Sequence, residues 1–220
     1  MTWRVSTCLL PGMAALILCL SPALHAEFVL EVEANGELEG AVVTATPRDA
    51  DIPRPPLPQE ALMVQANRQF DPFILPVPIG VPVRFPNRDD TAHHVYSFSP
   101  IGAFELPLYK GESPRTITFS KPGVVPLGCN IHDWMIGYIY VVDTPFYTQI
   151  TNNSARFASL PPATYDVSIW HPAIADLPVP SWQVAVSQAD DRQTLHLGYP
   201  FAEVTQPKPP AERFDEQWDY

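Results

Sequence analysis

Hydrophobic residues along the chain form short runs of about four to eight positions, unlike the long stripes of amphipathic helices. Several runs alternate hydrophobic and polar positions, and β-branched and aromatic residues are common within them. Pro, Gly and Asn separate the runs at intervals typical of a β-sandwich. The pattern predicts an all-β protein. The expected strands are residues 28–33, 41–46, 61–67, 74–77, 82–85, 94–98, 115–119, 124–127, 136–142, 146–150, 156–160, 165–170, 182–187 and 194–197.

Proline strengthens this prediction. It accounts for 27 of the 220 residues, which is roughly 12% against a usual ~5%. Because proline removes a backbone donor and breaks helix interiors, a protein built from long helices is not expected. Pro76, Pro78 and Pro82 are expected at strand ends or sheet edges. The proline-rich residues 52–58 are interpreted as an extended linker.

The first 26 residues have the features of a secretory signal peptide. Arg4 gives a positive start, residues 9–20 form an apolar run, and Ala26 is a small residue at the expected cleavage position. The run is too short to cross a membrane, and no later segment approaches the ~20 apolar residues that a span needs. We therefore expect a periplasmic protein whose mature chain has no membrane span.

The charge balance limits the partners. The chain has 24 Asp and Glu against 13 Lys and Arg, a formal net charge of −11. Nucleic acid is not expected as a partner, because phosphates are neutralised by Lys and Arg. We expect a monomer.

Export also changes the cysteine count. Cys8 and Cys19 leave with the signal peptide, so the mature chain keeps only Cys129. An unpaired cysteine in an oxidising compartment needs an explanation. It is either a small buried hydrophobic residue or a metal thiolate.

Residues 128–135 point to the second explanation. Cys129, His132 and Met135 follow one another at spacings of three. His93, 36 residues before Cys129, follows a turn-forming Asn and Asp cluster at the start of the strand expected at residues 94–98. Two imidazoles, a thiolate and a weak axial thioether are the donors of a blue-copper electron-transfer centre.

Other interpretations of these residues stay open. His93 could be structural, and Met135 could be a core residue. Two imidazoles and a thiolate could also hold zinc, although zinc gains nothing from a thioether. His94 is expected to point away from His93 on a strand and therefore not to bind the metal. His171, next to Trp170, is interpreted as packing.

The residues above resemble the cupredoxin family, most closely its amicyanin and plastocyanin branch. There a His on one strand is combined with Cys-x-x-His-x-x-Met on the loop before the last strand, and the similarity covers about residues 61–142. Periplasmic methylamine utilisation proteins share the Cys-Asn-Ile-His sequence of residues 129–132. The resemblance implies a Greek-key β-sandwich in which His93, Cys129, His132 and Met135 bind one type 1 copper ion. The family has Asn after the first His, where this chain has His94.

A second resemblance concerns the two ends of the mature chain. Residues 155–167 resemble the closing half of a carboxypeptidase regulatory-like (transthyretin-like) sandwich, and residues 28–47 resemble its opening strands. That pattern usually has Gly where this chain has Ser154 and Ala163. The two pieces could meet in space, with the copper domain inserted between them. The expected segments are a signal peptide (1–26), N-terminal strands with the linker (27–60), a cupredoxin copper domain (61–142), a smaller β-sandwich-like module (143–205) and a flexible tail (206–220).

The sequence favours a periplasmic one-electron carrier. A copper-binding or delivery protein and a metal-free β-sandwich assembly module are the alternatives. An enzyme is not expected, because multicopper oxidases and copper nitrite reductases need further His clusters, and His94, His171 and His196 suggest no second metal. The expected partner is a redox protein such as a basic cytochrome, which an acidic surface attracts over a distance.

Overall fold

The computed structural model describes residues 27–49, 51–187, 191–198 and 201–210. In these residues strands and loops dominate, and the single helical element is the 3-10 turn η1 (Pro172–Ile174). The prediction of an all-β protein is confirmed. The expected signal peptide, residues 1–26, lies outside the described residues. Within them, no helix is long and apolar enough to cross a membrane.

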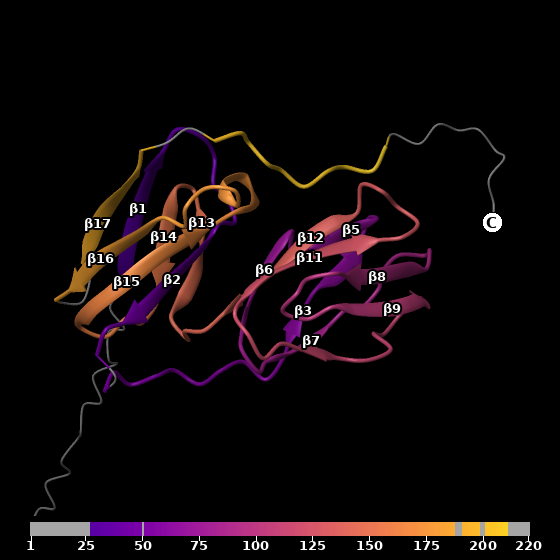
Figure 1. Cartoon of the computed structure of the whole chain (residues 1–220), viewed down its shortest axis with the longest axis horizontal. Helices are drawn as coiled ribbons and strands as arrows, with labels where there is room; N and C mark the ends of the chain where they lie inside the picture. Colours follow the sequence, from indigo (N-terminus) through magenta and orange to yellow (C-terminus); the bar gives the residue numbers. More distant parts are fainter. Residues whose placement is uncertain (1–26, 50, 188–190, 199–200, 211–220) are drawn as a thin grey trace, which may run out of the picture.

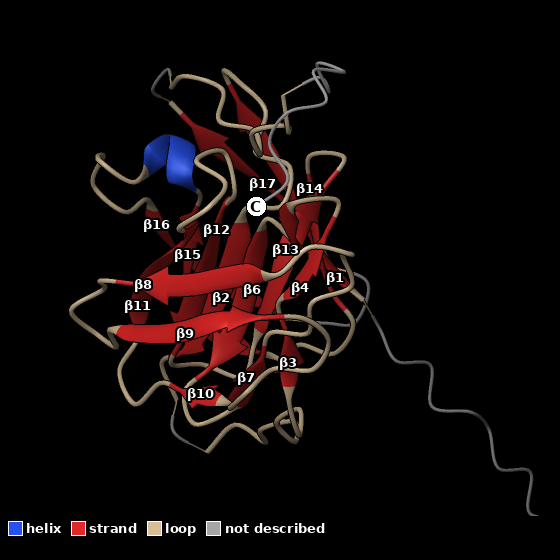
Figure 2. Ribbon diagram, turned by 90° about the vertical axis from the view of Figure 1, so that its right-hand side faces the viewer, coloured by secondary structure: helices blue, strands red, loops and turns tan. Residues whose placement is uncertain are grey.

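The first module combines a five-stranded sheet, a three-stranded sheet and a hairpin (Figures 1 and 2). The five-stranded sheet contains, in spatial order, β6 (Ile74–Pro78), β12 (Ile136–Val142), β11 (Gly123–Cys129), β8 (His93–Ser97) and β9 (Phe104–Tyr109). The three-stranded sheet contains β10 (Ile117–Thr118), β7 (Pro82–Arg84) and β3 (Ala61–Leu62). The hairpin pairs β4 (Val64–Ala66) with β5 (Gln69–Asp71).

The core of this module lies between the two larger sheets. On β8, His93, Val95 and Ser97 are buried, and the residues between them are partly exposed, as the two-residue period of a strand requires. Val83 of β7 and Leu127 of β11 belong to the same buried cluster. The alternation therefore turns His93 into the interior and His94 away from it.

The second module is one curled seven-stranded sheet built from both ends of the chain (Figure 1). Strand β1 pairs with β14 and with β17, and β2 pairs with β13 and with β15. The opening strands thus lie in the same sheet as the last third of the chain, while the domain boundaries expected from the sequence stay a prediction. The strands, in spatial order, are β16 (Ser181–Val186), β15 (Ala163–Trp170), β2 (Val42–Pro47), β13 (Tyr147–Thr151), β14 (Ser154–Phe157), β1 (Phe28–Ala34) and β17 (Arg192–Leu197).

An aromatic cluster joins the two modules. Trp170 of β15 is buried, and its ring stacks on Tyr140 of β12, with centroids 4.8 Å apart and planes at 6°. It also meets Tyr138 edge-on at 5.7 Å. Ile74 of β6 and Val42 of β2 complete the buried contact. Such pairs add to the stability gained from burial.

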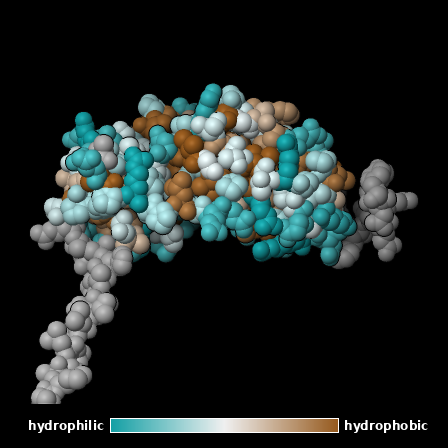
Figure 3. All heavy atoms as spheres, turned by 90° about the horizontal axis from the view of Figure 1, so that it is seen from below, coloured by the Kyte–Doolittle hydropathy of each residue, from teal (hydrophilic) through white to brown (hydrophobic). Residues whose placement is uncertain are grey.

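Two extended segments, the linker of residues 52–58 and residues 201–210, also run from one module to the other (Figure 1). In the linker, Pro55 and Leu57 line a shallow hollow with Ile79, Val142 and Pro145 at the junction. Viewed from below, apolar side chains gather in the middle of the molecule (Figure 3). At the other end, residues 201–210 return along the first module (Figure 1).

The C-terminal segment is attached to β5 at two points. The side chain of Gln206 donates to the Phe70 carbonyl at 2.6 Å, and that of Gln69 donates to the Pro207 carbonyl at 2.8 Å. The expected flexible tail, residues 206–220, is described only up to residue 210. This described part lies against the first module.

Two strands were not expected from the sequence. Strand β9 contains Pro107, which argues against a central strand, but β9 is the edge of its sheet and needs no donor on its outer side. Strand β5 is separated from β4 by Asn67 and Arg68, which both have φ of +56° and form the tight hairpin turn. The single strand expected at residues 61–67 is therefore two short strands followed by a turn.

The buried His171 predicts a pH dependence of stability. Its side chain is 2% exposed and its Nδ1 accepts from the Ala173 N–H at 3.2 Å, while burial lowers its pKa to about 4. As the pH falls below the unfolded value of ~6.5, the unfolded state binds a proton that the folded state excludes, so stability decreases. Between pH 7.5 and 4.5 we expect His171 to contribute a loss of about 2–3 kcal/mol.

Urea unfolding of the metal-free protein at both pH values checks this. His171→Gln should weaken the pH dependence, whereas His196→Gln, at an exposed position on β17, should leave it nearly as in the wild type. An unchanged pH dependence in His171→Gln would contradict the prediction.

Candidate metal centre

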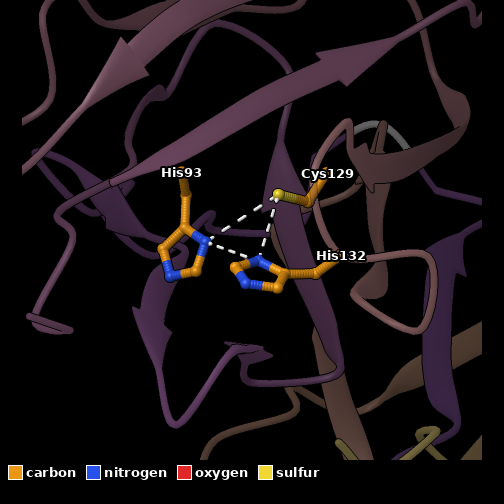
Figure 4. Close-up of side chains that lie close together, drawn as sticks. All are labelled: His93, Cys129 and His132. Atoms are coloured by element: carbon orange, nitrogen blue, oxygen red, sulfur yellow. Dashed lines mark hydrogen bonds between the residues drawn. The ribbon is translucent and has the colours of Figure 1, made fainter. Parts of the chain in front are cut away.

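Three side chains from two strands and a loop converge in the first module. Antiparallel pairing of β8 with β11 sets Val95 opposite Cys129, which brings the start of β8 close to the end of β11. His132 follows on the loop between β11 and β12. Figure 4 shows both imidazole rings turned toward the sulfur. The donor atoms of His93, Cys129 and His132 all lie within 4.8 Å of one another.

The three distances fit a single metal ion. The Nδ1 atoms of His93 and His132 are 3.2 Å apart, and Cys129 Sγ is 3.8 Å from the first and 3.7 Å from the second. The centre of the circle through these three atoms lies about 2.1 Å from each, close to the ~2.0–2.1 Å and ~2.3 Å of zinc–nitrogen and zinc–sulfur bonds. The two imidazoles and the thiol are also the trigonal donor set of blue-copper sites.

The surroundings of Cys129 favour the thiolate form of its side chain. Burial raises the pKa of Cys129, but the contact with the His93 ring and the hydrogen bonds from the backbone N–H groups of Ile131 and His94 outweigh this effect, so the pKa is lowered. The thiolate is the form that binds metals. The fold therefore favours the ligating form of the only cysteine among the described residues.

His93 is fixed from its far side. Its side chain has no exposed area, and its Nε2 lies 2.7 Å from the Asp89 carboxylate. Burial lowers the pKa of His93, while Cys129 and Asp89 raise it, with a net increase. Burial raises the pKa of Asp89, but hydrogen bonds from Arg68, His93 and Asn67 have the larger effect, so the pKa of Asp89 is lowered overall. The ring thus presents Nδ1 to the cluster and Nε2 to a carboxylate.

His132 lies nearer the surface. It is half-buried, and its pKa is lowered by burial and then by the neighbouring His93. The Trp134 ring packs beside it with centroids 5.1 Å apart. The indole N–H of Trp134 donates to the Arg68 carbonyl at 3.2 Å, which fixes this part of the loop to the β4–β5 turn.

Met135 lies in the interior close to this loop. Its side chain is fully buried, in the same hydrophobic cluster as Cys129. Its backbone N–H donates to the His132 carbonyl at 2.9 Å, which makes the loop a tight turn. Its role as an axial ligand stays a prediction.

His94 lies outside the cluster. Its Nε2 is 2.8 Å from Glu105 on the neighbouring β9, on the face opposite His93. The backbone N–H of His94 nevertheless reaches the Cys129 sulfur. The segments that carry His93 and Cys129 are therefore connected by a main-chain donor, which does not depend on the side chain at position 94.

Sequence reasoning missed the buried polar residues that connect the segments around Phe85, Thr91 and Tyr109. Gln65 is fully buried and donates to the Phe85 carbonyl at 2.8 Å, and Tyr109 donates to the same carbonyl. Asn87 donates to the Thr91 and Tyr109 carbonyls, both at 2.9 Å. The available signal was Gln65, a polar residue within an expected strand. A polar side chain that is buried in a strand usually has a hydrogen-bond partner, so Gln65 could have indicated a buried polar network.

The chain was compared with known proteins. No family model and no curated protein matches it. Among solved structures, a copper-containing nitrite reductase from Thermus scotoductus SA-01 matches with 26% identity and a TM-score of 0.36, over 44% of this chain and 25% of that one. The chain thus spans a quarter of that enzyme.

Two smaller proteins match over their whole length. A purple cupredoxin from Nitrosopumilus maritimus has 22% identity and a TM-score of 0.34, over 38% of this chain and all of that one. A reduced amicyanin in which one tryptophan is replaced by tyrosine has 21% identity and a TM-score of 0.36, over 47% of this chain and all of that one. Matches of this size assign neither family nor function to the chain.

Proposed function

We propose that the protein is a periplasmic type 1 copper protein that acts as a one-electron carrier. The observation that carries this proposal is the buried triangle of His93 Nδ1, Cys129 Sγ and His132 Nδ1, with separations of 3.2–3.8 Å. Copper, when bound there, supplies a one-electron couple. Met135 is proposed as the fourth, axial donor because it is buried beside the same loop.

The chain's own residues supply a rigid site. Strands β8 and β11 fix the positions of His93 and Cys129, and hydrogen bonds fix the loop that carries His132. Ligands held in this way move little when the charge of the site changes, which favours rapid electron exchange. His93 and Cys129 are buried, so the partner is expected to approach at the half-exposed His132, beside the exposed Ile131.

Spectroscopy of the copper-loaded protein tests the proposal. One equivalent of Cu(II) should give intense visible thiolate-to-copper absorption that disappears on one-electron reduction and returns on oxidation. A colourless Cu(II) adduct would contradict a type 1 site. Loss of the copper to a weak chelator within seconds would favour delivery over electron transfer.

Electron exchange with a basic cytochrome tests the carrier role. The net charge of −11 should accelerate the encounter at low salt. The stopped-flow rate should therefore fall steeply as the ionic strength rises, since the field is screened beyond about 8 Å at ~0.15 M. A rate that is independent of salt would contradict electrostatic attraction of the partner.

A further inference from the structure

The carboxylate of Asp89 is held in place by the main chain of a distant turn. Asn67 donates its backbone N–H to Oδ1 at 2.6 Å, and Arg68 donates its own to Oδ2 at 2.9 Å. Both donors are in the left-handed conformation, with φ of +56°, which turns two successive N–H groups toward one anion. The backbone N–H of Asp89 donates in turn to Oδ1 of the Asn87 side chain at 2.9 Å.

This fixed carboxylate meets the buried ring of His93. Oδ2 lies 2.7 Å from Nε2, and the ring is fully buried. A carboxylate accepts hydrogen bonds, so the contact places the ring proton on Nε2. The other nitrogen, Nδ1, then carries a free lone pair directed at Cys129 and His132 (Figure 4).

We propose that Asp89 is a positioning residue that selects this tautomer of His93 and strengthens the ring as a metal donor. The second part rests on the copper site proposed above. A negative charge behind the imidazole increases its basicity, and it stabilises Cu(II) more than Cu(I) because the more highly charged ion gains more. Asp89 therefore favours the oxidised site and lowers its reduction potential.

The metal-free protein tests the first part. Nitrogen-15 NMR of the imidazoles at pH 8 should show His93 with its proton on Nε2 in the wild type. In Asp89→Ala the two tautomers should be mixed, because no acceptor remains on that side. A wild-type His93 protonated on Nδ1 would overturn the proposal, whether or not copper binds.

Metal affinity and potential test the second part. Asp89→Asn keeps a side chain of the same shape and removes the charge, and Asp90→Asn removes the same charge from a neighbouring position outside the cluster. We expect Asp89→Asn to lower the Cu(II) affinity about 10–100-fold, with a smaller loss for Cu(I) and a raised potential. Asp90→Asn should leave the affinities and the potential close to the wild type.

The outcomes separate the two proposals. If Asp89→Asn and Asp90→Asn behave alike, the special role of Asp89 as a charged partner is overturned while the copper site stands. If the wild type binds no copper but holds His93 as the Nε2–H tautomer, the proposed function fails and the positioning role is supported.

Discussion

Replacing Cys129 with Ser should abolish the visible absorption of the copper-loaded protein and lower its Cu(II) affinity by several orders of magnitude. Cys129 is the only cysteine among the described residues, and it is the thiol in the cluster with His93 and His132. A serine hydroxyl is not a soft ligand and stays protonated near neutral pH, so it cannot replace the thiolate. Visible absorption and competitive copper titration check the result.

Met135→Leu is the matched control for this variant. Leucine conserves the volume of a fully buried side chain, and such an exchange usually costs less than about 1.5 kcal/mol. This variant should keep the copper and the colour, and its reduction potential should rise, because the axial ligand tunes the site without building it. Retained intense colour in Cys129→Ser would contradict the proposed site altogether.

Trp170→Ala should lower the free energy of unfolding by about 3–5 kcal/mol, the usual loss for a buried tryptophan. The change removes the ring that stacks on Tyr140 and meets Tyr138, and thereby the centre of the contact between the modules. Guanidinium unfolding of the metal-free protein measures the loss. The copper spectrum of the folded variant should be unchanged, since the proposed ligands lie in the first module.

Trp182→Ala is the control for the aromatic contact. Trp182 is also on the second module but is only partly buried against that module's own core. Its removal should cost less and leave the junction intact. An equal or smaller loss for Trp170→Ala would show that the junction contributes little to stability.

The sequence was most informative where the chemistry is local. Cys129, His132 and Met135 lie within seven positions. A candidate metal site with so little intervening chain can be recognised from the spacing of its residues. His93 could be added because it comes directly before the strand expected at residues 94–98; β8 begins one residue earlier, at His93 itself. Geometry that follows from strand alternation, such as the opposite directions of His93 and His94, was predicted for the same reason.

Contacts that depend on loop conformation could not be predicted in this way. Asp89 reaches His93 across an irregular turn, and its other partners, Asn67 and Arg68, belong to a hairpin that was expected to be the end of a strand. The conformation of that turn is set by packing of the whole module, and nothing in residues 61–71 alone specifies it. Strand β9 was missed because it contains Pro107. A proline is acceptable in an edge strand, but whether a strand lies at an edge depends on the tertiary fold.

The placement of β1 and β2 in a sheet with β13–β17 has a consequence for the order of events during folding. Both opening strands are synthesised about 100–160 residues before the strands that pair with them, since Thr44 pairs with Tyr147 and Val29 with Arg192. Until then their hydrogen-bonding edges are open to other chains. Early folding of residues 61–142 would bring the two ends of this long interval together and reduce the entropy cost of closing it. The first module would then fold early and hold together the two parts of the second module, which precede and follow it in the sequence.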